Sequence, residues 1–97
     1  MNPQELTQTV VSIIETTSNK IGVENDFNRE MNSIGVSQTS SGIHKFDGTA
    51  DTANKIHSHL IKLGYVHDDI LGEYNKPVGK TFHVVKVSNK SVAHRFL

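Results

Sequence analysis

TFHVVKV, residues 81–87, decides the fold, because it is the strongest strand in the sequence. It is rich in β-branched residues and carries an aromatic, which are types that favour a pleated, half-buried surface. The turn residues NKPVG, 75–79, stand before it, and a short strand with Ile70, Leu71 and Tyr74 stands before those. Two strands joined by so short a turn predict an antiparallel hairpin. Alternation along 81–87 places two sets of side chains on opposite faces, Phe82, Val84 and Lys86 against His83, Val85 and Val87.

A helix precedes this hairpin and has the clearest periodicity in the chain. Thr49 or Asp51 is its N-cap, and Gly64 ends it. Its apolar residues are spaced by three or four, as on one buried helical face; they are Ala53, Ile56, Leu60 and Leu63. The preceding segment, 36–48, is rich in serine at first and becomes strand-like at 43–46. We therefore expect a loop there that leads into one strand or a hairpin.

Two further helices are expected before residue 36. The first begins with residues that suit a helix start, Asn2, Pro3 and Glu5. Its apolar residues keep roughly to one face; they are Leu6, Val10, Ile13, Ile14 and Ile21. Gly22 ends this helix. The second, shorter helix begins at Asn25 or Asp26, carries the stripe Phe27, Met31 and Ile34, and ends at Gly35.

The end of the chain, 91–97, carries Val92 and Phe96 four residues apart, so it forms either a terminal helical turn or a docked tail. Internal repeats, long linkers and low-complexity tracts are absent from the sequence. We therefore predict a single α+β domain over residues 1–97, with two N-terminal helices, one central helix and a small antiparallel sheet of about three strands.

Composition excludes several classes of function. The chain has 97 residues and no cysteine, which rules out disulfides, thiolate catalysis and cysteine-bound zinc or iron–sulfur clusters. The start, MNPQELTQTVV, lacks the basic segment and the apolar run of a signal peptide, and no 18 apolar residues run together. We expect a cytoplasmic protein that does not interact with membranes and is monomeric or weakly dimeric.

The sequence VGKT, 78–81, imitates the end of a phosphate-binding loop, but three observations exclude one. The motif G-x-x-x-x-G-K-[ST] needs glycine where Tyr74 stands. It should open a helix, whereas the strand 81–87 follows. Pro77 also removes one of the backbone amides that would bind phosphate.

The chain has six histidines, one of which stands beside two acids, so metal binding and catalysis have to be considered. His57 and His59 lie roughly 200° apart around the helix axis, so they do not share a metal from that helix. His67 stands next to Asp68 and Asp69, a pairing that suits acid–base catalysis. No glycine-framed serine and no second convergent cluster accompany it. We expect solvated or partly packed histidines, no metal, no cofactor and no enzymatic activity.

Charge divides the chain in two and suggests two alternative binding surfaces. Residues 1–51 hold seven acids and three bases, whereas residues 52–97 hold three acids and seven bases. Acids displayed on one face can occupy a lysine- and arginine-lined channel meant for phosphates; the candidates are Glu24, Asp26, Glu30, Asp68, Asp69 and Glu73. The basic C-terminal third offers direct nucleic-acid contact instead; its candidates are Lys76, Lys80, Lys86, Lys90 and Arg95.

The whole chain resembles the small inhibitors that bacteriophages and mobile elements encode against CRISPR surveillance complexes, in particular inhibitors of the type I-F complex. The shared features are its size, the lack of cysteine, the α+β composition, the helix-rich start and the lack of a catalytic signature. This resemblance rests on no diagnostic motif. It implies a phage protein that evades host defence by binding the basic, nucleic-acid-recognising surface of a host ribonucleoprotein complex and excluding target DNA. Known DNA mimics are strongly acidic, whereas this chain has net charge zero, so mimicry here would be local to one face. The alternative function is a small nucleic-acid-binding accessory or regulatory domain that uses the basic third.

Overall fold

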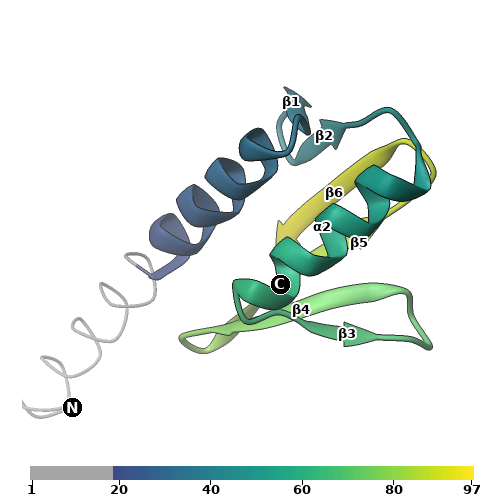
Figure 1. Cartoon of the computed structure of the whole chain (residues 1–97). Coiled ribbons are helices and arrows are strands. Elements are labelled where there is room, and N and C mark those ends of the chain that lie inside the picture. Colours follow the sequence, from purple (N-terminus) through teal and green to yellow (C-terminus); the bar gives the residue numbers. More distant parts are fainter. Residues whose placement is uncertain (1–18) are drawn as a thin grey trace, which may run out of the picture.

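The strand predicted at 81–87 lies at the centre of the fold. A computed structural model describes residues 19–97, and in it β5 (Thr81–Val87) pairs with β4 (Glu73–Val78) on one side and β6 (Ser91–Phe96) on the other. The described strands form one antiparallel sheet in the order β1-β2-β6-β5-β4-β3 (Figure 1). The α+β class and the β4–β5 hairpin are therefore confirmed.

The hairpin turn is shorter than predicted. Strand β4 continues through Pro77 to Val78, and Gly79, with a φ of 58°, opens a turn of only two residues. Its positive φ suits the turns that match strand twist. On the other side of β4, pairing with the neighbouring strand β3 (Val66–Asp68) stops at Asn75. That side of β4 is therefore unpaired at Pro77, so the missing proline N–H costs no hydrogen bond of the sheet.

Among the six strands of residues 19–97, β3 and β6 were not expected from the sequence, and the segment before residues 43–46 was expected to be a strand only as one half of a possible hairpin. The tail 91–97 was predicted as a helical turn or a docked tail, but it forms β6. Val92 and Phe96 are an even number of residues apart, so they share a face in a strand as well as in a helix. The serine-rich loop predicted after residue 36 is β1 (Ser37–Ser40), an edge strand exposed along its whole length, and it forms a hairpin with β2 (Ile43–Lys45).

The short strand predicted around Ile70 and Leu71 is also misplaced. Those two residues lie in the turn between β3 and β4. The prediction of about three strands was therefore too low, because the sheet has six strands within residues 19–97.

Residues 19–33 form one helix, so the prediction that Gly22 separates two helices is wrong. Gly22 keeps helical backbone and has open space where a Cβ would point. The stripe of the predicted second helix is confirmed, since Phe27 and Met31 are fully buried. Gly35 follows with a φ of 81°, as expected of a helix-ending glycine. The predicted helix start at Asn2 to Glu5 lies outside the described residues.

The central helix is confirmed as α2 (Ala50–Lys62). Of the two possible caps, Thr49 is the N-cap, and its hydroxyl accepts a hydrogen bond from the Thr52 backbone N–H at 3.2 Å. Ile56 and Leu60 are buried, and Gly64, with a φ of 95°, follows the helix end.

Both helices pack on one face of the sheet, which we call the covered face. Tyr74, Val85 and Val92 alternate onto this face and share one apolar core with Phe27 of the 19–33 helix and Ile56 of α2. The opposite face, the open face, carries the alternate residues; on β5 these are Phe82, Val84 and Lys86, as predicted. Antiparallel sheets commonly leave one face largely to solvent; here Phe82 and Lys86 are exposed, whereas Val84 between them is 2% exposed.

Candidate docking surface

Three strongly exposed apolar side chains lie within residues 66–71, in β3 and in the turn between β3 and β4. Ile70 is 95% exposed, Val66 67% and Leu71 62%. Asp69, whose side chain is 90% exposed, stands between them. Scattered exposed hydrophobics are ordinary, but three within six residues mark a patch. We call Val66, Asp69, Ile70 and Leu71 the docking tip.

The tip is held in shape by the neighbouring carboxylate. Asp68 Oδ1 accepts hydrogen bonds from the backbone N–H groups of Ile70 and Leu71, each at 3.0 Å. The Asp68 carbonyl accepts a further bond from Gly72 N–H at 2.8 Å, and Gly72 has a φ of 68°. A turn fixed by its own backbone bonds loses little conformational freedom when it docks. Asp68, predicted as a partner contact, therefore shapes the tip.

The other two acids of this region differ in their freedom. Asp69 Oδ1 lies 2.9 Å from His67 Nδ1 and keeps most of its carboxylate in solvent. Glu73 lies 3.8 Å from the Arg95 guanidinium, and its side chain is mostly covered. Of the three predicted acids here, Asp69 is the one that offers an exposed charge.

Two of the three predicted acids of the 19–33 helix, Glu30 and Asp26, are engaged within the chain. Glu30 lies 2.5 Å from His59 Nδ1 and 3.3 Å from Lys62 Nζ, so it links the two helices. The hydrogen bond from His59 lowers the pKa of Glu30. Asp26 lies 2.5 Å from the Arg29 guanidinium. These carboxylates stabilise the helix layer.

The two predicted groups of acids do not form one surface. The helix that carries Glu24, Asp26 and Glu30 packs on the covered face, whereas Asp68 and Glu73 pair across β3 and β4 on the open face. The six predicted acids therefore do not form one continuous surface that could imitate the phosphates of nucleic acid.

The predicted bases are also divided. Lys76 lies on the covered face, where its ammonium donates to the Leu63 carbonyl at 2.6 Å. Lys86 and Arg95 lie exposed on the open face. Lys80 and Lys90 occupy the turns at opposite ends of β5.

Sequence reasoning missed a third base on the open face. Lys45 of β2 pairs with Ser91 of β6, so its side chain is on the same face as Lys86 and Arg95. None of the strands β1, β2, β5 and β6 contains an acid. Only the unexpected pairing of β2 with β6 brings Lys45 there, and no local pattern could have found it.

A cluster of rings lies behind the tip. His67 stacks on Tyr74 with ring centroids 4.4 Å apart, and Tyr74 Oη is hydrogen-bonded to His57 Nδ1 at 2.6 Å. Burial raises the pKa of Tyr74, with the charge of Asp69 as a second cause. Tyr74 therefore stays protonated at neutral pH and fixes α2 to β4. The predicted pairing of His67 with a neighbouring acid is present, and it lies beside an exposed turn.

Two histidines differ from the expectation of solvated or partly packed rings. His44 and His83 are fully buried on the covered face. The signal for His83 was present, because it alternates with Val85 and Val87 along a strand with one buried face. His44 gave no such signal, since β2 has only three residues.

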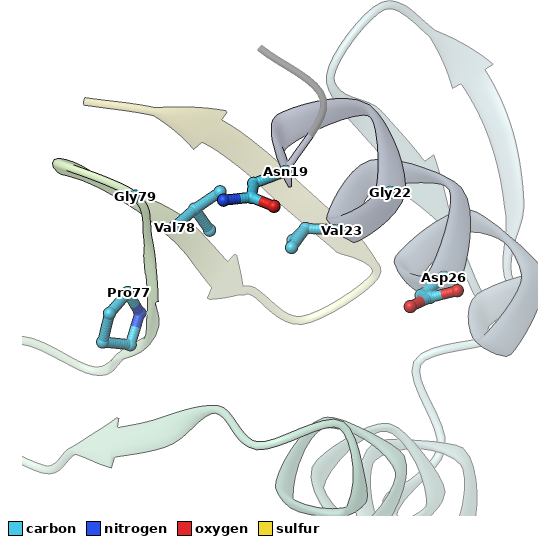
Figure 2. Close-up of a pocket in the computed structure, with 7 residues that line it drawn as sticks. All are labelled: Asn19, Gly22, Val23, Asp26, Pro77, Val78 and Gly79. Carbon is cyan, nitrogen blue, oxygen red and sulfur yellow. The ribbon is translucent and has the colours of Figure 1, made fainter. Parts of the chain in front are cut away.

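One groove lies between the 19–33 helix and the β4–β5 turn. Figure 2 shows Asn19 and Val23 on the helix side, with Val78 and Pro77 across from them. Among the described lining residues, the charged one is Asp26, which is paired with Arg29. Among residues 19–97, no three histidine, cysteine, aspartate or glutamate side chains are grouped so that they could hold a metal ion. Neither of the two described helices is long and apolar enough to cross a membrane.

With the geometry in view, comparison with known proteins adds no assignment: no family model, curated protein or solved structure matches the chain. Any function has to be argued from the surfaces described above.

Proposed function

We propose that the chain is a non-enzymatic inhibitor that docks through its tip onto a nucleic-acid-binding complex in the cytoplasm of a bacterial host, and keeps nucleic acid from that complex. The observation that carries this proposal is the apolar exposure at residues 66–71, led by Ile70 at 95%. The fold leaves this side chain in water, so its burial by a partner would favour binding. Full burial of an isoleucine or leucine side chain contributes about 1.5–3 kcal/mol.

The chemistry of the partner follows from the charge beside the tip. Asp69 presents one exposed carboxylate next to Ile70. An apolar pocket rimmed by lysine or arginine, as on a surface that binds phosphates, complements this arrangement. The contact is mainly apolar, with a single carboxylate for steering, so it is a narrower form of mimicry than six acids would give. The CRISPR surveillance complex of type I-F is the partner that the family resemblance implies.

A competition assay tests this proposal. Purified type I-F surveillance complex is mixed with labelled target DNA, and the shifted band is followed as the protein is added. We expect the band to disappear at protein concentrations near that of the complex. If DNA stays bound at large excess of the protein, the inhibitor function is rejected.

Direct nucleic-acid binding is the second candidate, favoured by the three exposed bases on the open face. Lys45, Lys86 and Arg95 lie on neighbouring strands, and Phe82, on the same face, offers a partly exposed ring for base stacking. Anisotropy titrations of labelled single-stranded DNA at two salt concentrations separate the candidates. Tight binding that weakens with salt and is lost in the Lys86→Glu, Arg95→Glu variant would favour the second function over the first.

A further inference from the structure

Three histidine rings surround one phenylalanine between the 19–33 helix and the sheet. Phe27 has its ring centroid 5.4 Å from that of His44, 5.3 Å from His83 and 4.6 Å from His94. The histidines come from three different strands, β2, β5 and β6, and their rings lie on the covered face. At Phe27 the helix therefore packs on three imidazole rings in addition to the apolar core.

The hydrogen bonds of these rings form a chain that suits neutral imidazoles. Tyr65 Oη is bonded to His83 Nδ1 at 2.5 Å, and His83 Nε2 to His94 Nδ1 at 3.0 Å. Each neutral ring carries one proton, so the chain can run in one direction from Tyr65 to His94. Within the described residues, His94 Nε2 and both nitrogens of His44 have no hydrogen-bond partner. A second proton on His44 would add a buried charge with no acceptor.

The charges around the cluster do not compensate for protonation. Burial lowers the pKa of His94, and the charge of Glu24 on the 19–33 helix opposes this shift without reversing it. Burial lowers the pKa of His44, and the charge of His94 adds to this. Burial lowers the pKa of His83 to about 4, with His94 and Lys76 as further causes.

We propose that His44, His83 and His94 form an acid-sensitive latch, which holds the 19–33 helix on the sheet while the rings are neutral and releases it when they take up protons. The helix is the element that moves, because its Phe27 contacts all three rings; its other described link, from Glu30 to His59 and Lys62, lies on α2 and not on the sheet. Release would expose Phe27 and Met31 together with the covered face beneath them.

The direction and size of the effect follow from linkage. Above the ordinary histidine pKa of 6.5 the rings are neutral in both states and pH has no effect. Below it, a released ring binds a proton more readily than a buried one, so each pH unit favours release by up to about tenfold per histidine. For His83 the effect ends near pH 4 and reaches about 300-fold in the release equilibrium.

Hydrogen exchange of the full chain, corrected for the intrinsic pH dependence of amide exchange, tests the latch. Peptides from the 19–33 helix are compared with peptides from α2 and β5 at pH 7.5, 6 and 5. We expect protection of the 19–33 helix to fall by at least about tenfold between pH 6 and pH 5 while α2 and β5 keep theirs. Unchanged protection of the helix, or equal loss in all three segments, would overturn the proposal.

The variant His44→Leu provides the matched test. Neither nitrogen of His44 has a partner, so leucine removes a titrating group without breaking a hydrogen bond. Release should then require a lower pH, whereas His67→Gln, a change at a histidine outside the cluster around Phe27, should leave the midpoint in place. An unchanged midpoint in His44→Leu would contradict the latch. Titration of the histidine ring protons of the wild-type chain by NMR gives the same answer without a variant, because the latch requires midpoints below 6.5 for the three rings.

Discussion

A matched pair of isoleucine truncations separates the docking tip from the core. Ile56 and Ile70 are the same residue type in opposite environments, since Ile56 is fully buried on α2 and Ile70 is 95% exposed at the tip. Truncation of Ile56 to alanine removes buried carbons, each worth about 0.8 kcal/mol, and leaves a cavity among the side chains of the core. We expect Ile56→Ala to lower the free energy of unfolding by about 3 kcal/mol. The same truncation at Ile70 removes carbons that are already in water, so we expect a change within about 0.5 kcal/mol.

Urea unfolding followed by circular dichroism measures both values under the same conditions. The slope of the free energy with urea should be the same in the two variants, so that the midpoints report stability. A loss of more than about 1 kcal/mol for Ile70→Ala would show that the tip is packed against the body of the protein, and would refute the reasoning that the fold leaves these side chains for a partner.

Two further predictions concern the ends of α2. Thr49→Ala removes the N-cap hydroxyl that accepts from Thr52 N–H, and should lower the unfolding free energy by about 1 kcal/mol, measured by urea unfolding; Thr49→Ser, which keeps the hydroxyl, should restore most of it. Gly64→Ala places a Cβ on a residue with a φ of 95° and should destabilise the protein by about 1–2 kcal/mol in the same assay. The nearest atom to the new methyl group would be 3.9 Å away, so the cost comes from the backbone conformation and not from a clash. A neutral result would mean that the backbone relaxes out of the left-handed region.

The elements that the sequence predicts well are those whose pattern has one interpretation. The central helix has a cap, an apolar stripe and a terminal glycine that agree with one another, and residues 81–87 alternate over a full strand length. The β6 strand was not predicted, because the spacing of Val92 and Phe96 fits both a helix and a strand. The β1 strand was predicted only as one half of a possible hairpin. It is an exposed edge strand that buries no side chain, so Ser37–Ser40 has the composition of a loop.

The docking surface was predictable in part. The sequence singled out residues 67–73 for their acids, and the structure places an exposed tip there, although the exposure comes from Ile70 and Leu71, which were assigned to a strand. Charge counting did not reveal which acids are free. Glu30 is engaged by His59 across two helices, and that contact depends on tertiary packing that no local pattern records.

The central claim, that the tip docks on a nucleic-acid-binding complex, is tested most directly by comparing two variants in the DNA competition assay with the type I-F surveillance complex. Ile70→Ser, Leu71→Ser removes the apolar tip, and Ile61→Ser changes a 45% exposed isoleucine on α2 instead. The account predicts that the tip variant needs at least about tenfold more protein than the wild type to release DNA, while Ile61→Ser matches the wild type. Equal inhibition by the tip variant and the wild type would contradict the account.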